Sequence, residues 1–116
     1  MSQYILLLHE SATVTQGISP DQIQGIIQRY KSWSASLASK GHLRGGNKLQ
    51  DGTGRVVRNG GGSVSVTDGP FAEGKELVAG YFLLEAANYD EAVKLSRDCP
   101  HLDFGTIEVR EIEPTP

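Results

Sequence analysis

The sequence predicts a single α+β domain of the ferredoxin-like kind. Three observations support this fold class. Strand-like and helix-like segments alternate along the chain, two strand-like segments are apolar on both faces, and the composition is that of an ordinary soluble globule, with 38% hydrophobic and 22% charged residues. A chain of 116 residues typically forms one domain that buries about two thirds of the surface exposed in its unfolded form. We therefore expect residues 1–116 to form one domain.

The first half of the chain predicts a strand, a long helix and a weaker strand. Residues 3–9 form a short apolar run that is typical of a buried strand. A helix follows, because Ser19 can cap its first turn, Pro20 suits its first position and Gln22 can return a hydrogen bond to the cap. Residues 42–50, which include a glycine pair, predict the weaker strand. The apolar residues of the helix recur at helical spacing and form one face: Ile23, Ile26, Ile27, Tyr30, Trp33 and Leu37.

The middle of the chain predicts a hairpin and a central strand. Residues 55–58 and 63–66 flank an Asn-Gly-Gly-Gly turn, which is a strong hairpin signal. The alternation in these two segments leaves one face polar, so we expect the hairpin at the edge of the sheet. Residues 77–86 form a long apolar run and predict the central strand.

The last third predicts a second helix and a final strand. Asn88 can cap this helix, with Glu91 three residues later, and Pro100 stops it. Residues 105–112 predict the last strand. The resulting order is a ferredoxin-like βαββαβ sandwich with an inserted β-hairpin. The inner face of the second helix is expected to consist of Ala92, Val93, Ser96 and Cys99.

The strands carry more apolar surface than two helices can cover. Two helices cover one face of a four-stranded sheet, but residues 4–8 and 78–84 are apolar on both faces. A second copy that packs sheet against sheet is the simplest cover for the remaining face. We therefore expect a homodimer.

Composition excludes several classes of partner. The formal net charge of −3 argues against a nucleic-acid partner, because no basic surface attracts phosphates. The single cysteine, Cys99, allows no internal disulfide and does not point to secretion. The apolar run near the N-terminus is too short for a signal peptide or a membrane span. We expect a cytoplasmic protein without a membrane partner.

The segment "VTDGPFAEGKELVAGYFLLEA" (residues 66–86) resembles the signature of the YCII-related family, in its DGPF branch. The similarity extends to residues 41–46, 90–102 and 105–112. The resemblance implies a dimeric α+β barrel built from ferredoxin-like subunits. It also implies a bacterial, regulatory or stress-related setting, because members of this branch often lie beside extracytoplasmic-function sigma factors.

The resemblance implies chemistry only in part. Members closer to YCII itself carry a His and an Asp as a paired active site, and some relatives of this fold are small lactone isomerases or cleave small aromatic-derived acids. Counting back from Gly41, the position of the family His falls at Tyr30. The family Asp, just before a proline, falls at Cys99. This chain is therefore expected to lack both members of the pair.

Four residues are catalytic candidates: His9, Tyr30, Asp68 and His101. His9 ends the first strand, where it can act as a general base or form an ordinary hydrogen bond with a neighbour. Asp68 precedes Gly-Pro, so its carboxylate can lie at the mouth of a cleft or simply stabilise the turn. His101 and Asp103 are two residues apart and can form an acid–base pair, which is too small for a metal site.

Four further residues are candidates for ligand binding: Trp33, Phe71, Glu76 and Tyr81. Core packing is the default for Trp33 and Tyr30, but both have a polar group that can face a pocket, with Tyr30 as a hydrogen-bond donor. Phe71 can alternatively fill the dimer core, and Glu76 can form an ion pair across the dimer interface. His42 is expected to be solvated. We expect no metal and no cofactor; the glycine run lacks the Lys and Ser/Thr of a phosphate loop and is interpreted as a hairpin turn.

Three classes of function remain open. The first is a small-ligand-binding or regulatory accessory dimer that is linked to a sigma-factor pathway. The second is a cofactor-independent enzyme that transfers protons on a small acidic or lactone-like molecule. The third is a purely structural dimer. The first class is favoured, because the His–Asp pair is missing and no nucleophile or metal signature replaces it.

Overall fold

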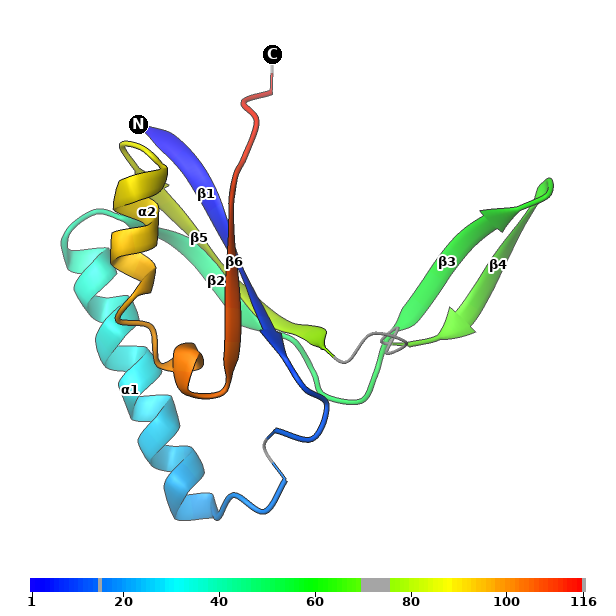
Figure 1. Ribbon diagram of the computed structural model, residues 1–116, viewed down its shortest axis with the longest axis horizontal. Helices are drawn as coiled ribbons and strands as arrows, with labels where there is room; N and C mark the ends of the chain where they lie inside the picture. Colours follow the sequence, from blue (N-terminus) through cyan, green and yellow to red (C-terminus); the bar gives the residue numbers. More distant parts are fainter. Residues whose placement is uncertain (15, 70–75, 116) are drawn as a thin grey trace.

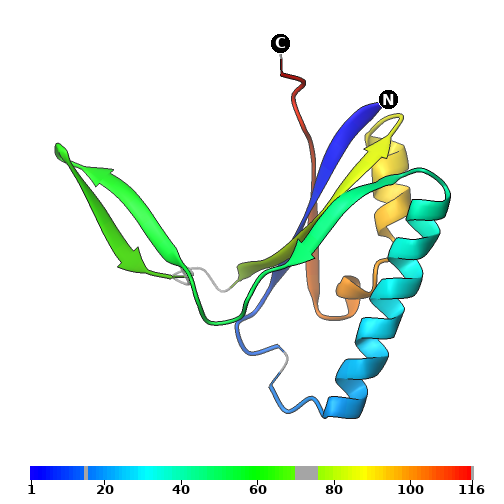
Figure 2. The ribbon, with the colours of Figure 1, turned by 180° about the vertical axis from the view of Figure 1, so that it is seen from behind.

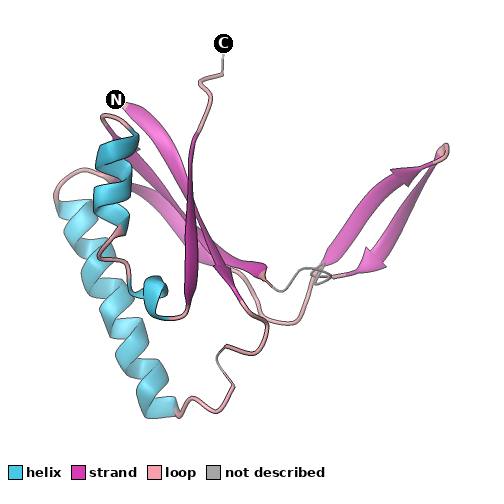
Figure 3. Cartoon of the chain, viewed as in Figure 1, coloured by secondary structure: helices cyan, strands magenta, loops and turns pink. Residues whose placement is uncertain are grey.

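The computed structural model describes residues 1–14, 16–69 and 76–115, in which two helices cover one face of a four-stranded antiparallel sheet (Figures 1 and 3). The strands of this sheet lie in the order β2-β5-β1-β6, which confirms the predicted ferredoxin-like α+β fold. The elements of this body are β1 (Ser2–Glu10), α1 (Pro20–Ser39), β2 (Leu43–Lys48), β5 (Leu77–Ala86), α2 (Tyr89–Ser96), the 3-10 turn η1 (Pro100–Asp103) and β6 (Gly105–Glu111).

Both helices begin where the sequence predicts. The Ser19 hydroxyl accepts a hydrogen bond from the Gln22 N–H at 3.2 Å, and the Gln22 side chain accepts one from the Ser19 N–H at 2.9 Å. The Asn88 side chain accepts from the Glu91 N–H at 2.9 Å. Each cap satisfies backbone donors that have no partner within the helix, which sets the start of the helix.

Two predictions about local surroundings are wrong. Val93 is 37% exposed, whereas Leu95 packs against the core, so Ala92, Leu95 and Ser96 form the face of α2 that meets the sheet. His42 is half-buried rather than solvated. Its Nδ1 lies 2.8 Å from the carbonyl oxygen of Glu85, which ties the start of β2 to the end of β5.

The core lies between the sheet and the helices. Tyr4, Leu6 and Leu8 alternate along β1 and are at most 6% exposed. Trp33 of α1 meets the ring of Phe82 edge-on, with 4.9 Å between the ring centroids. The Trp33 indole N–H also donates to the carbonyl oxygen of Leu95 at 3.1 Å, so its polar group is satisfied within the core.

No helix of the described residues covers the second face of the sheet (Figure 2), and β1 and β5 place apolar side chains there. Ile5 pairs with Leu83, and Leu7 pairs with Tyr81, so these four half-buried side chains lie together on one surface. We call this surface the open face. The sequence-based prediction of two apolar faces is confirmed for β1 and β5.

The inserted hairpin forms a sheet of its own. Strands β3 (Arg55–Gly60) and β4 (Ser63–Asp68) pair with each other and extend away from the body, so we call them the arm (Figure 1). The prediction of an edge position in the main sheet is wrong, because a turn signal sets local pairing and not the place where a hairpin docks. The arm also accounts for a radius of gyration of 16.2 Å, against about 13 Å for a compact chain of this length.

Candidate functional site

A cavity of about 490 Å³ lies beneath the N-terminal half of α1. Its floor is the sheet, and η1 and the residue after it border one end. Gly80 pairs with Leu8 and Gly46 pairs with Phe82, and both glycines line the cavity, where the ring of Phe82 packs against Gly46. The apolar wall includes Leu8, Ile18, Ile23, Ile26, Phe82 and Phe104.

Tyr30 and His101 form a hydrogen-bonded pair in the cavity wall. The Tyr30 hydroxyl lies 3.2 Å from Nδ1 of His101, and Nε2 of His101 lies 2.8 Å from the backbone carbonyl oxygen of His9. A carbonyl oxygen can only accept, so Nε2 carries the proton. In the neutral ring Nδ1 is then an acceptor, and the Tyr30 hydroxyl donates to it.

The surroundings fix this pair in place. His101 is 2% exposed, and Gly105 permits its close approach to β1, since a Cβ at Gly105 would lie 3.0 Å from Nε2 of His101 and collide with the His9 carbonyl. Burial, and to a smaller extent the nearby Cys99 and Glu10, raise the pKa of the Tyr30 hydroxyl. Tyr30 therefore stays a neutral donor at physiological pH.

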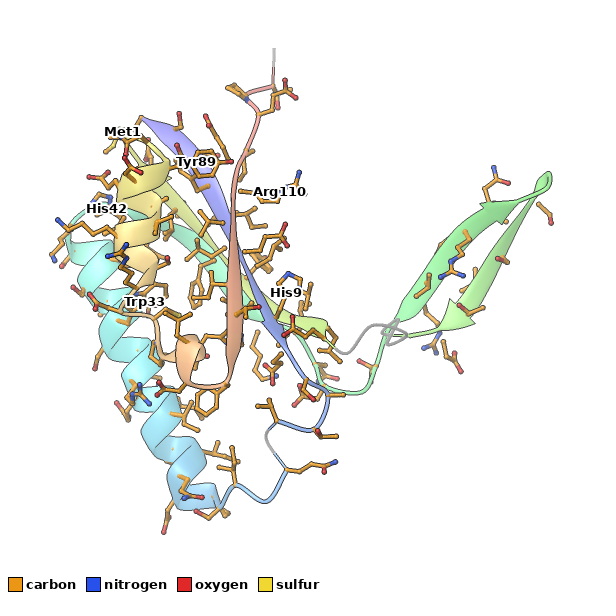
Figure 4. All side chains as sticks on the ribbon, in the orientation of Figure 1. Met1, His9, Trp33, His42, Tyr89 and Arg110 are labelled. Carbon is orange, nitrogen blue, oxygen red and sulfur yellow. The ribbon has the colours of Figure 1, made fainter. Side chains whose placement is uncertain are left out.

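The imidazole of His9 does not face the cavity. The His9 side chain lies on the side of the sheet away from the helices (Figure 4), where its Nε2 is 2.9 Å from Oε1 of Glu108. The backbone carbonyl oxygen of His9 is the atom that contacts His101. The β1–β5 register shifts between Leu8 and His9. His9 thus supports the site through its backbone.

The structure places the acidic candidates elsewhere. Asp68 ends the arm, 93% exposed, with its Oδ1 3.5 Å from Nε of Arg55. Asp103 forms an ion pair with Arg29 at 2.7 Å, so it is not the partner of His101. Glu76 is exposed and does not line the cavity.

The aromatic candidates lie in different parts of the molecule. Trp33 lies in the core on the helix side of the sheet (Figure 4). Tyr81 lies on the open face, where its hydroxyl accepts from the Asn47 side chain at 3.2 Å. Phe71 lies outside the described residues. Of the eight predicted site residues, the structure brings together Tyr30 and His101.

Sequence reasoning missed the partnership of these two residues, because they are 71 positions apart. It also missed the rim of the cavity, to which Glu10 and Lys31 contribute. The one local signal was Gly105, four residues after His101, where a side chain would not fit against β1.

Cys99, at the position that the resemblance gives to the family Asp, is 3% exposed within the core. Burial raises the pKa of its thiol from 9.0 to about 11, so it stays a neutral thiol. Residues 1–14, 16–69 and 76–115 contain no group of three or more His, Cys, Asp or Glu that could hold a metal ion. Within the same residues, no helix combines the length and apolarity that crossing a bilayer requires.

A curated relative and a solved structure are among the matches with known proteins. A protein of Rhizobium meliloti (strain 1021), described as uncharacterized protein R00369, is 29% identical over 112 residues, which cover 94% of this chain and 90% of that protein. The structure of 5-chloro-2-hydroxyhydroquinone dehydrochlorinase from Burkholderia phenoliruptrix AC1100, in complex with 2,5-dihydroxybenzoquinone, is similar over 96% of this chain and 93% of that one. The identity is 16% and the TM-score 0.49. The similarity is one of backbone fold, and the quinone is a ligand of the dehydrochlorinase.

The family pattern of the YCII-related domain matches residues 2–116. This match covers nearly the whole chain, including both helices, the main sheet and the arm. The protein therefore belongs to the YCII-related domain family.

Proposed function

We propose that this protein binds a small, largely apolar molecule in the cavity beneath α1. The observation that carries the proposal is a cavity of about 490 Å³ with a buried Tyr30–His101 pair in an otherwise mostly apolar wall. Small-molecule sites typically have volumes of about 300 to 1,000 Å³, apolar walls and a few placed polar groups. A purely structural role would favour a filled core beneath the N-terminal half of α1, but the cavity lies there instead.

The polar groups indicate the kind of molecule. The Tyr30 hydroxyl can turn from His101 to donate to a carbonyl or carboxylate oxygen of the ligand. Lys31 lies at the rim and makes no ion pair within the described residues, so it can meet an acidic group. A small acid or a lactone fits these donors and the apolar wall.

We also propose that the functional unit is a cytoplasmic homodimer joined through the open face. Ile5, Leu7, Tyr81 and Leu83 form an apolar surface there that a second sheet can cover, as in an α+β barrel. The sigma-factor association that the family resemblance implies makes a regulatory or accessory role the favoured setting.

A second candidate function is cofactor-independent proton transfer in the same cavity. It is favoured by the fixed tautomer of His101, whose Nδ1 becomes a free acceptor when the Tyr30 hydroxyl turns to a substrate oxygen. Nδ1 can then take a proton from the α-carbon of the substrate carbonyl and later return it. The Tyr30 hydroxyl stabilises the enolate that forms in between. Such a step needs no metal or redox partner.

Calorimetric titration with benzoate and with δ-valerolactone tests the binding proposal. Ile27 lines the cavity, so Ile27→Trp should fill the space and abolish binding, whereas Gln24→Trp adds the same ring to an exposed position of α1 outside the lining. We expect wild type and Gln24→Trp to bind at least one probe equally well. Equal binding by Ile27→Trp, or no binding of either probe to wild type, would contradict the proposal.

Hydrogen–deuterium exchange at the α-carbon of δ-valerolactone tests the second candidate. In D₂O, an acid–base site replaces the α-protons by deuterons without net reaction, which proton NMR detects. We expect the exchange to be faster with wild type than with Tyr30→Phe or His101→Gln. Binding without any enhanced exchange would leave ligand binding as the function and reject the enzyme.

A further inference from the structure

The two faces of the arm differ in character. Val57 pairs with Val66 across the hairpin, and Val64 lies on the same side two pairs further toward the tip. These three side chains are 64%, 60% and 66% exposed, and we call them the valine face. Ser63, Ser65 and Thr67 occupy the opposite side of β4.

The arm has little support of its own. A two-stranded hairpin is marginally stable in water, and the arm pairs with no strand of the main sheet within the described residues. At its base, the Gly69 N–H donates to the carbonyl oxygen of Gly54 at 2.9 Å, and Arg55 lies opposite Asp68. Three exposed valines on one side of such a hairpin indicate a surface that packs against another molecule.

The position of the arm indicates what that molecule is. In both ribbon views the arm leaves the body on the side of the open face, and α1 and α2 lie on the other side (Figures 1 and 2). A molecule that covers the open face therefore also comes beside the arm. Each copy of the chain carries both uncovered surfaces, and a two-fold axis lets two copies cover both surfaces at once.

The areas agree with this arrangement. From standard strand spacing and rise, one face of the main sheet spans about 500 Å² and one face of the arm about 200 Å². A stable interface buries about 800 Å² on each partner. The open face and the arm together, about 700 Å² in projection, are of the size of such an interface.

We propose that the arm is a clasp that packs its valine face on a second copy of this chain. This inference rests on the proposed homodimer and adds a second contact region to it. The open face joins the two sheets, and each arm reaches past the sheet edge to the partner. Loss of the valine face then weakens the dimer without changing the fold of either body.

The triple substitution Val57→Thr, Val64→Thr and Val66→Thr tests the clasp. Threonine keeps the branched shape and the strand preference of valine but adds a hydroxyl that opposes burial. Six valines change per dimer, so we expect the dissociation constant measured by analytical ultracentrifugation to rise about 100-fold. The control Ser63→Thr and Ser65→Thr changes the opposite side of β4 and should leave the constant within about threefold of wild type.

Labelling gives an independent readout. Val64→Cys and Ser65→Cys place a thiol on opposite sides of the arm, and Cys99 is buried and protonated, so it reacts slowly with a fluorescent reagent. We expect the emission of a polarity-sensitive dye at position 64 to shift to the red on dilution to monomer, and the dye at position 65 to shift little. Equal shifts at both positions would overturn the clasp.

The outcomes separate the clasp from the proposed dimer. If the triple threonine variant dimerises like wild type, the clasp is wrong and the open-face dimer stands. If Leu7→Lys on the open face still dimerises while the triple variant does not, the open-face contact is wrong and the arm stands. If the wild-type protein is a monomer at about 100 µM, a concentration well above the dissociation constants of stable dimers, both contacts are wrong.

Discussion

Helix α1 carries apolar side chains at helical spacing along its whole length, but its two halves meet different surroundings. In the C-terminal half, Trp33 and Leu37 are 8% and 4% exposed and belong to the core. In the N-terminal half, Ile23 and Ile27 are 42% and 38% exposed and line the cavity. Tyr30 lies between the two halves, and its ring packs against the core while its hydroxyl meets His101.

The sheet beneath the helix causes this difference. Under the C-terminal half, Leu6 and Leu84 fill the space and are fully buried. Under the N-terminal half, Gly46 and Gly80 add no side chains of their own, and the ring of Phe82 lies against Gly46. The same helical pattern therefore forms a core at one end and a pocket wall at the other, depending on the strands it crosses.

Leu37→Ala should have the largest effect, because it removes a side chain from the packed half. We expect the free energy of unfolding to fall by about 3 kcal/mol, in the range for a buried leucine that leaves a cavity. Urea denaturation followed by circular dichroism measures the change. The matched substitution Leu49→Ala removes the same atoms from a side chain that is 44% exposed and should cost less than about 1 kcal/mol. Equal costs would contradict the division of the helix.

The pH dependence of stability at Cys99 tests whether the core beside the packed half of α1 excludes water. Burial raises the pKa of its thiol from 9.0 to about 11, so the folded state holds the proton after the unfolded state has lost it. Stability from this group is complete below pH 9 and is lost as the pH rises through 11. We expect wild type to lose about 2 kcal/mol more than Cys99→Ala between pH 8 and 11, as measured by urea unfolding at each pH. Parallel pH curves for the two proteins would show that the thiol is well solvated.

Tyr30→Phe tests the boundary between the halves. The substitution keeps the ring in the core but leaves Nδ1 of the buried His101 without its donor, which should cost about 1 to 2 kcal/mol. Tyr89→Phe is the control: its hydroxyl accepts from the Glu111 N–H at 2.7 Å, but the residue is 46% exposed, so water replaces the lost bond. Nitrogen-15 NMR of the histidine rings should show a changed Nδ1 signal in Tyr30→Phe. An unchanged signal would mean that the pair does not form in solution.

The sequence was sufficient to predict the elements of the fold because their signals are local. The Ser19 and Asn88 caps, the hairpin turn and the long apolar run of β5 each lie within a few residues of the boundary that they set. The placement of the arm was not predictable in this way, since it depends on contacts that the turn residues do not make.

The site was predicted only in part, for the same reason. Tyr30 and His101 were both candidates, but periodicity favoured core packing for Tyr30, and nearness along the chain pointed to Asp103 as the partner of His101. The deciding features are Gly105, which lets His101 approach β1, and the two glycines of the floor. A glycine in a strand has several possible causes, so its meaning appears only when the opposite element is known.

Ile27→Ala should have the smallest effect on stability and a clear effect on the cavity. The side chain is 38% exposed and packs on one side only, so we expect a loss below about 1 kcal/mol in urea denaturation. The cavity becomes wider at this point and loses part of its apolar wall, so the affinity for benzoate or δ-valerolactone should fall about threefold to tenfold in the calorimetric titration. Gln24→Ala, on the exposed side of the same half-helix, should change neither quantity. A loss of stability as large as that of Leu37→Ala would mean that the N-terminal half packs as a core in solution, and the pocket would then not exist.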